Sequence, residues 1–271
     1  MSEIPMEVYF NSGEDEFDYL DMLQGSKSIE GASEVSILTS SAILERKVPK
    51  KTNKVKDIRA KFRASFEGSF KQPFDLVISG DEKVREFQRL SERGFYEIFK
   101  SILSKPLGIN YETTNVKAIR WLQENREDVL DLADRLREPL IRMHKPVENQ
   151  GYIVAFKRRG KNIFTLNSRT LEYIKTEVKE LESKVIEVSV SRFNSRTGTG
   201  RCISDMDADS ISFSPASAWQ HFPVRQKKKM SENLNTLTAG NFQLIRMEVR
   251  RVLDVRQRVK HYRVVRVIVD D

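Results

Sequence analysis

Clustered lysine and arginine side chains in the second half of the sequence are the residues best suited to chemistry. Residues 1–150 carry 24 Lys and Arg against 26 Asp and Glu, whereas residues 151–271 carry 23 against 13. Clustered cations gain affinity for a polyanion because their binding displaces the counterions condensed on its phosphates. The charge distribution therefore predicts contact with nucleic acid, either DNA or RNA.

These cations fall into three groups. One lies in a predicted turn at residues 157–161, another at residues 225–229, and the third on a predicted C-terminal hairpin at residues 242–269. Cations on a turn or strand face can reach a phosphate backbone, but cations on an exposed strand also protect it from aggregation. The predicted phosphate-contacting residues are Lys157, Arg158, Arg159, Lys161, Arg225, Lys227, Lys228, Lys229, Arg246, Arg250, Arg256, Arg258, Lys260 and Arg263.

Aromatic residues are interleaved with the cations. Exposed rings of this kind stack on the bases of single-stranded nucleic acid. Large aromatic side chains are more often buried, so we expect about six of them to belong to the core. The residues concerned are Tyr152, Phe156, Phe164, Phe193, Phe213, Trp219, Phe222 and Tyr262.

Motifs for catalysis and metal binding are weak. Glu182 and Lys184 match the acidic-x-Lys half of a metal-dependent nuclease core, but no second carboxylate is predicted at the start of a preceding strand. The acidic run at residues 205–209 lacks the bidentate glutamate of a calcium loop, because Ala216 stands at that position. Residues 198–200 fit a hairpin turn better than a nucleotide cradle. The sequence therefore predicts no catalytic residue, metal or cofactor, and favours a protein that is not an enzyme.

Cysteine content and hydropathy indicate a compartment. The single cysteine, Cys202, excludes an internal disulfide and a cysteine-based zinc site, and it fits a reducing environment. The N-terminus lacks the features of a secretory signal, and no run approaches the ~20 apolar residues of a membrane span. We expect a cytoplasmic protein that does not enter a membrane.

A small antiparallel sheet covered by helices is predicted for residues 1–149. Alternating apolar residues on both sides of a turn indicate a hairpin at residues 58–78. Residues 17–42 carry an apolar stripe that Gly25 and Gly31 interrupt, so one kinked helix or two short ones would fit. Two further helices are predicted at residues 81–105 and 114–139, with Trp121 and Met143 in the core or an interface.

A domain boundary is predicted at residues 144–151, which have the composition of a linker. The fold class is then α+β, with an N-terminal α/β domain at 1–149 and a basic β-rich domain at 150–271. Five or so short strands and one interposed helix in the second domain match a small barrel of the oligonucleotide-binding or SH3-like type. An open sheet with the same number of strands is the alternative.

The order of these elements, together with the turn Glu67-Gly68-Ser69-Phe70, resembles uncharacterised two-domain bacterial proteins. Some of those proteins come from mobile-element or phage-defence gene neighbourhoods. The resemblance implies a bacterial accessory or defence role. It brings no catalytic or binding residue to any position of this chain.

Three functions are compatible with these patterns. The leading hypothesis is a non-enzymatic nucleic-acid-binding protein. The alternative is a protein-interaction or regulatory subunit whose basic face docks an acidic partner, with the acidic stretch at residues 14–21 able to mask that face. A metal-dependent nuclease that uses Glu182 and Lys184 is the third.

Overall fold

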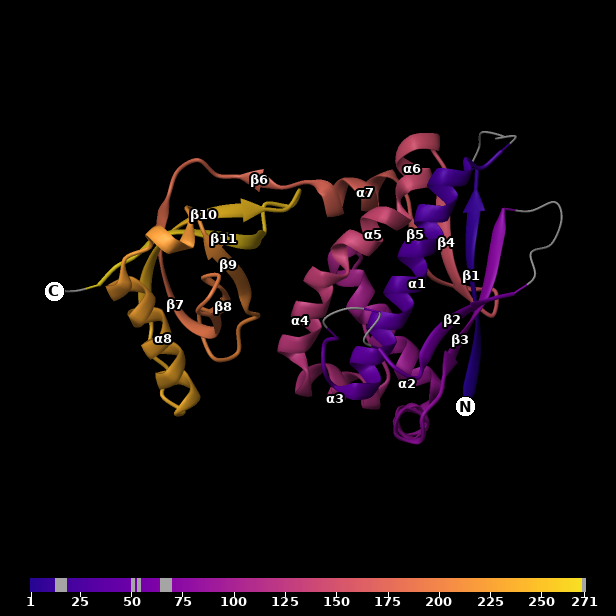
Figure 1. The fold of residues 1–271 in the computed structure, drawn as a ribbon, viewed down its shortest axis with the longest axis horizontal. Helices are drawn as coiled ribbons and strands as arrows, with labels where there is room; N and C mark the ends of the chain where they lie inside the picture. Colours follow the sequence, from indigo (N-terminus) through magenta and orange to yellow (C-terminus); the bar gives the residue numbers. More distant parts are fainter. Residues whose placement is uncertain (13–18, 50–51, 53–54, 64–69, 270–271) are drawn as a thin grey trace. The chain divides into compact units, whose positions relative to one another are not determined.

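The computed structural model contains two compact units, residues 1–175 and 176–271 (Figure 1). It describes the whole chain except residues 13–18, 50–51, 53–54, 64–69 and 270–271. The fold is α+β, as predicted. The unit boundary follows residue 175 instead of residue 149.

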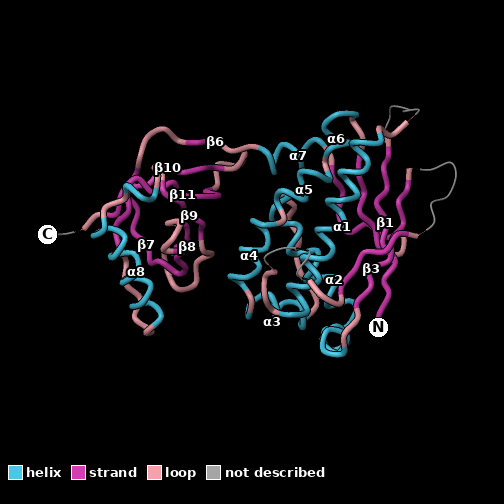
Figure 2. The backbone as a smooth tube through the Cα atoms, viewed as in Figure 1, coloured by secondary structure: helices cyan, strands magenta, loops and turns pink. Residues whose placement is uncertain are grey.

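Unit 1 is a five-stranded antiparallel sheet with helices layered on one face (Figures 1 and 2). The strand order is β2-β3-β1-β4-β5. The strands are β1 (Ser2–Asn11), β2 (Ile58–Phe62), β3 (Lys71–Ile78), β4 (Ile153–Arg158) and β5 (Lys161–Leu166). The helices are α1 (Met22–Glu45), α2 (Asp81–Leu107), α3 (Val116–Glu124), α4 (Arg126–Arg135), α5 (Arg137–Met143), α6 (Lys145–Gln150) and α7 (Ser168–Lys175).

Local patterns explain much of this unit. In β1, every second residue from Ile4 to Phe10 is buried, as expected of a strand with one face on the core. The hairpin predicted at residues 58–78 is confirmed, since Ile58 lies opposite Ile78 in the β2–β3 register. The predicted turn at Glu67 and Gly68 lies outside the described residues.

The linker predicted at residues 144–151 is part of unit 1 instead. Residues 145–150 of this segment form α6, in which Pro146 and Val147 are buried. The hairpin of β4 and β5 then joins the sheet, because β4 pairs along β1 from Asn11 back to Met6. Polar composition here marks the exposed side of a short helix and not a connection between domains.

Unit 2 is a closed five-stranded barrel. Its strands are β7 (Lys184–Asn194), β8 (Thr199–Ile203), β9 (Ile211–Pro215), β10 (Ile245–Leu253) and β11 (Val259–Val267). The 3₁₀ helix η2 (Trp219–His221) and α8 (Val224–Thr238) connect β9 to β10, and the short β6 (Val178–Lys179) pairs with the end of β10. Its core includes Val190, Phe213, Met247 and Val264.

Strand order identifies the type of barrel. Neighbours follow the order β7-β8-β9-β11-β10, and β10 pairs with β7 to close the ring. All neighbouring pairs of the barrel are antiparallel except β9 with β11. This order, with a helix between the third and fourth strands, is the oligonucleotide-binding arrangement. It excludes the open sheet and decides between the two predicted barrel types.

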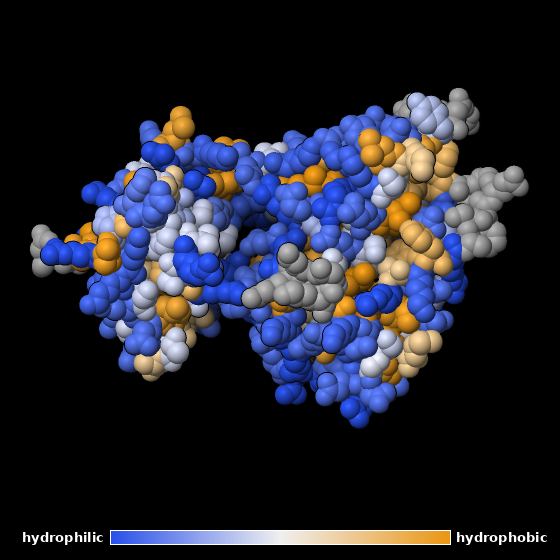
Figure 3. All heavy atoms as spheres, viewed as in Figure 1, coloured by the Kyte–Doolittle hydropathy of each residue, from blue (hydrophilic) through white to orange (hydrophobic). Residues whose placement is uncertain are grey.

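No helix in the described part of the chain is long and apolar enough to cross a membrane. On the face drawn in Figure 3, hydrophilic side chains cover most of unit 2, and apolar side chains show only in small patches.

Candidate nucleic-acid interface

The unit boundary changes how the positive charge is divided. Unit 1 carries 30 Lys and Arg against 27 Asp and Glu, and unit 2 carries 17 against 12. Residues 151–271, the predicted basic domain with Gly151 as its first counted residue, carry ten more cations than carboxylates. The barrel unit, residues 176–271, carries only five more. Unit 2 is still the more basic for its size.

The basic turn at residues 157–161 does not belong to the barrel. It joins β4 to β5 in the sheet of unit 1, and Lys161 is the first residue of β5. The prediction that three basic groups lie in one small domain is therefore wrong for this group. The local hairpin was predicted, but its pairing with β1, far away in the sequence, was not.

Most cations of this turn already have partners within unit 1. The Lys157 ammonium lies 4.0 Å from the centre of the Tyr9 ring. Arg158 pairs with Glu92, and the Nη1 of Arg159 lies 3.4 Å from the same carboxylate. These contacts explain the three cations as parts of the sheet surface.

The second basic group, at residues 225–229, forms the first turns of α8. Lys227 lies with its ammonium 4.8 Å from the Trp219 ring, and Lys228 pairs with Glu232 at 3.6 Å. The first turn of α8 contains no acidic residue, so nothing there offsets the positive end of the helix dipole. An approaching anion would be attracted to this end of the helix.

Part of the third group stabilises the hairpin of β10 and β11. The buried carboxylate of Asp254 accepts hydrogen bonds from the backbone N–H groups of Arg256 and Arg258, and from the Arg258 Nε at 2.9 Å. Lys260 donates to the Thr176 carbonyl oxygen at 3.4 Å. These cations hold the β10–β11 turn and the start of unit 2.

Ion pairs neutralise further arginines of the hairpin. Arg251 forms two hydrogen bonds to Glu180, at 2.7 and 2.6 Å, and these bonds lower the pKa of that carboxyl. Arg266 lies 2.6 Å from Glu248. Hydrogen bonds from Ser183 and Arg266 likewise lower the pKa of Glu248.

Two arginines of the hairpin are arranged differently. Arg250 lies directly opposite Arg263 in the antiparallel register of β10 and β11, and both side chains are exposed. The Arg263 Nη2 donates to the Ala216 carbonyl oxygen at 3.2 Å. Within the described residues, no ion pair joins either guanidinium group to a carboxylate. Like charges directly opposite each other destabilise a sheet. This pair therefore lowers the stability of the folded barrel when no anion is bound.

Two residues of the barrel strands that the sequence did not single out are His261 and Arg192. His261 of β11 lies opposite Ser212 of β9, and its ring is 2.8 Å from the Ser212 hydroxyl and 2.7 Å from the Ser214 hydroxyl. Arg192 of β7 lies opposite Arg201, which is buried and donates to the Ser210 hydroxyl at 2.7 Å. The alternation of apolar and polar residues along one strand could not predict these neighbours, because it does not determine which residues of a distant strand lie opposite.

We call the exposed arginines Arg250 and Arg263, with the neighbouring His261 of β11, the outer barrel face. Arg246 lies on the same strand as Arg250, opposite Glu187 of β7. The face thus combines residues from two adjacent strands, β10 and β11, whereas Arg192 lies eight residues along β7 from Lys184, the residue that faces Val249.

The aromatic residues follow the prediction that most are core. Phe193, Trp219 and Tyr262 are half-buried against the barrel core, and the Trp219 Nε1 donates to the Ser195 carbonyl oxygen at 2.8 Å. Stacking on a fully exposed ring is therefore not a feature of this set. The fully buried members are Tyr152, Phe156, Phe164, Phe213 and Phe222.

The structure brings no catalytic group together around the predicted candidates. Among the described residues, no group of three or more His, Cys, Asp or Glu side chains could hold a metal ion. Glu182 is exposed, and the Lys184 ammonium lies 3.9 Å from Glu180. Burial raises the pKa of the Cys202 thiol to about 12, which keeps it protonated.

Comparison of the chain with protein-family models, curated proteins and solved structures found no match. The resemblance to two-domain bacterial proteins stays a prediction.

Proposed function

We propose that the chain is a non-enzymatic nucleic-acid-binding protein whose outer barrel face contacts the phosphate backbone. The observation that carries the proposal is the exposed Arg250–Arg263 pair on adjacent strands. A guanidinium group matches the geometry of phosphate and binds it with two parallel hydrogen bonds. A phosphate between these side chains would turn an unfavourable contact into a favourable one.

The surroundings of the pair support a polyanion over a single small anion. His261 lies two residues before Arg263 on β11, and Arg256 and Arg258 are exposed in the β10–β11 turn. Contacts spread along the hairpin match a ligand with regularly spaced phosphates.

The barrel type offers a comparison by analogy. Barrels of this arrangement bind oligonucleotides across their second and third strands and the loops after the first and fourth strands. Here those elements are β8, β9 and the loops at residues 195–198 and 254–258. Of these, the last loop carries Arg256 and Arg258, and the arginine pair lies beside that loop on the fourth and fifth strands, β10 and β11. Because one fold serves many functions, the proposal depends on the arginine pair and not on the fold.

The test is binding of labelled single-stranded and duplex DNA and RNA to the full chain by fluorescence anisotropy, with magnesium or manganese present to expose any cleavage. We expect salt-sensitive binding of intact probe. Arg250→Gln and Arg263→Gln should each weaken the affinity by about fivefold to tenfold at low salt.

The matched control is Arg93→Gln, which removes the same charge from an exposed, ion-paired site on α2 of unit 1. Its affinity should stay within about twofold of the wild type. Equal weakening by all three substitutions would show that only net charge matters. Absence of binding by every probe at low salt would contradict the proposal and favour the acidic-protein partner.

A further inference from the structure

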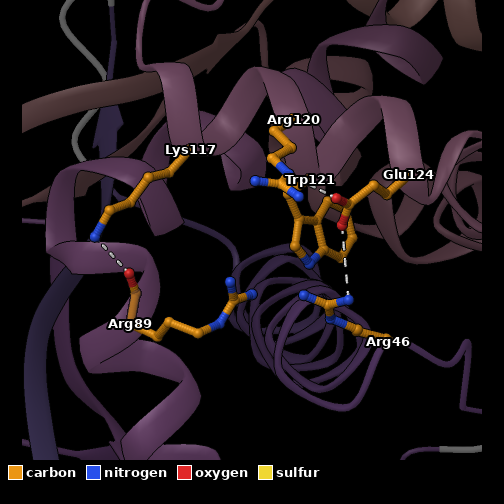
Figure 4. A pocket seen from close by; sticks show the side chains of 6 residues that line it. All are labelled: Arg46, Arg89, Lys117, Arg120, Trp121 and Glu124. Atoms are coloured by element: carbon orange, nitrogen blue, oxygen red, sulfur yellow. Dashed lines mark hydrogen bonds and ion pairs between the residues drawn. The ribbon is translucent and has the colours of Figure 1, made fainter.

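A hollow in unit 1 is lined by four cations and lies outside the proposed interface. Its volume is about 430 Å³, within the range of small-molecule sites. Figure 4 shows the side chains that line it, and they come from three helices. These residues are Arg46, Arg89, Lys117, Arg120, Trp121 and Glu124.

The helices place these side chains on a common wall. Lys117, Arg120, Trp121 and Glu124 occupy positions three or four residues apart on α3, so they share one face of that helix. Arg46 is the left-handed residue that ends α1, with φ of 50°. Arg89 projects from α2.

A shared carboxylate holds two of the arginines. Glu86 accepts two hydrogen bonds from Arg89, both at 2.6 Å, and lies 3.5 Å from the Arg46 Nε. The hydrogen bond from Arg89 is the main cause that lowers the pKa of Glu86, so this carboxyl stays ionised. The Lys117 ammonium donates to the Arg89 carbonyl oxygen at 2.6 Å, which links α3 to α2. The cations are thus positioned before any ligand arrives.

Trp121 supplies the observation that points to a ligand. Its side chain is 3% exposed, which confirms the prediction that it belongs to the core. The indole Nε1 is buried and has no hydrogen-bond partner within the described residues. Figure 4 shows this nitrogen on the side of the Arg46 and Arg89 guanidinium groups.

These neighbours cannot satisfy the indole N–H. A guanidinium group has only donors, and a buried donor without an acceptor costs about 1–3 kcal/mol. An acceptor that enters the hollow would satisfy Trp121 and both arginines together. An anion with several oxygens is the group that fits.

We propose that the hollow binds the phosphate group of a small phosphorylated molecule. Its oxygens accept hydrogen bonds from the Trp121 Nε1 and from the guanidinium groups of Arg46 and Arg89. Four cations of the site stand against two carboxylates, Glu86 and Glu124, and a phosphate dianion balances that excess.

Glu124 favours a ligand with a single phosphate over a ligand with several. Its carboxylate lies 2.8 Å from Arg120 and 3.7 Å from Arg46, in the same wall. It repels a second phosphate, and it can accept a hydrogen bond from a hydroxyl group. The site therefore favours one phosphate on a hydroxyl-bearing molecule over a polyphosphate or a nucleic-acid strand.

The experiment follows the indole N–H signals of the ¹⁵N-labelled full chain by NMR. The chain has two tryptophans, Trp121 and Trp219, and the Trp121→Phe spectrum assigns them. Inorganic phosphate and glucose 6-phosphate should move the Trp121 signal downfield and leave the Trp219 signal in place. Glucose, without a phosphate, should move neither.

Substitutions locate the site. Arg46→Gln and Arg120→Gln should weaken the phosphate titration by about tenfold and about threefold, because a charge-assisted hydrogen bond is stronger than an exposed ion contact. Arg85→Gln is the matched control, since Arg85 is exposed on α2 and does not line the hollow. Dispersed amide spectra verify that each variant is folded.

Three results would overturn the proposal. One is a Trp121 signal that phosphate and glucose 6-phosphate do not move while the amide spectrum stays folded. Another is a loss of affinity in Arg85→Gln as large as in Arg46→Gln. The third is a Trp121 shift caused by single-stranded DNA and by neither small phosphate, which would assign the hollow to nucleic acid. Each readout is independent of binding at the barrel.

Discussion

His144 shows how a buried titratable side chain can serve structure alone. It is completely buried, with its Nδ1 2.7 Å from the Leu140 carbonyl oxygen and its Nε2 2.9 Å from the Thr170 hydroxyl. Glu97 is similar, because its carboxylate accepts hydrogen bonds from the backbone N–H groups of Thr114 and Asn115. Both side chains have their hydrogen bonds within the fold, unlike the Trp121 indole.

The first prediction concerns pH and His144. Burial lowers the pKa of His144 from its ordinary 6.5 to about 4. Between these two values the unfolded chain binds a proton that the folded chain does not, so the free energy of unfolding falls as the pH is lowered. The loss should reach about 3 kcal/mol near pH 4. Urea unfolding across this range measures it.

His144→Gln provides the comparison, because glutamine does not titrate. The variant is less stable at neutral pH, but its free energy of unfolding should depend less steeply on pH below 6.5 than that of the wild type. Parallel pH curves for the two proteins would show that His144 is not the group responsible.

At the scale of elements, side chains determine where helices end and how they pack. The segment predicted as one helix at residues 114–139 is divided, because the Asn125 amide donates to the Trp121 carbonyl oxygen at 2.7 Å and ends α3. Conversely, α1 is continuous through Gly25 and Gly31. A Cβ at Gly31 would collide with the Pro139 carbonyl oxygen, so this glycine allows α1 and α5 to approach closely and is not a break.

In the barrel strands, the sequence predicts which residues are buried but not which residues of neighbouring strands lie opposite each other. Ile245, Met247 and Val249 alternate with polar residues in the sequence, as expected of a strand with one face on the core, and all three are buried. The direct opposition of Arg250 and Arg263 could not be predicted. A register shift between Glu248 and Val249 determines it, and such bulges leave little local signal.

The second prediction concerns the attachment of α8 to the barrel. Asn233 is buried, accepts a hydrogen bond from the Val190 N–H at 2.6 Å and donates to the Gln243 carbonyl oxygen at 2.8 Å. Asn233→Ala leaves both backbone groups unsatisfied and should destabilise unit 2 by about 2–3 kcal/mol. Asn235→Ala, two residues later on the exposed side of α8, is the control and should change stability by less than about 0.5 kcal/mol. Similar losses in both variants, measured by thermal unfolding, would contradict this role.

At the scale of the whole molecule, the chain has two units of the predicted types, but the boundary between them lies after residue 175 and not after residue 149. A helical N-terminal part and a barrel were both expected, yet the β4–β5 hairpin was assigned to the barrel. Two consecutive strands and a basic turn look alike whichever sheet they join. Only the pairing of β4 with β1, about 145 residues earlier in the chain, assigns them to unit 1.

The third prediction compares two fragments. Residues 176–271 contain all the strands of the barrel and the β6 strand that pairs with β10, so this fragment should fold as a monomer with a dispersed NMR spectrum. Residues 150–271 add β4 and β5 without β1, which exposes Val154 and Phe156, and this fragment should self-associate in sedimentation experiments. If residues 150–271 were folded and monomeric while residues 176–271 were unfolded, the boundary would lie after residue 149.

The most direct test of nucleic-acid binding is the slope of log Kd against log salt for the best-bound oligonucleotide. Each phosphate contact contributes about 0.7–0.9 to that slope, so the full chain with Arg250→Gln and Arg263→Gln together should have a slope shallower by about 1.4–1.8 than the wild type. The double variant must stay folded, as its amide spectrum would show. An unchanged slope would mean that these arginines do not contact phosphate, and the outer barrel face would lose its assigned role.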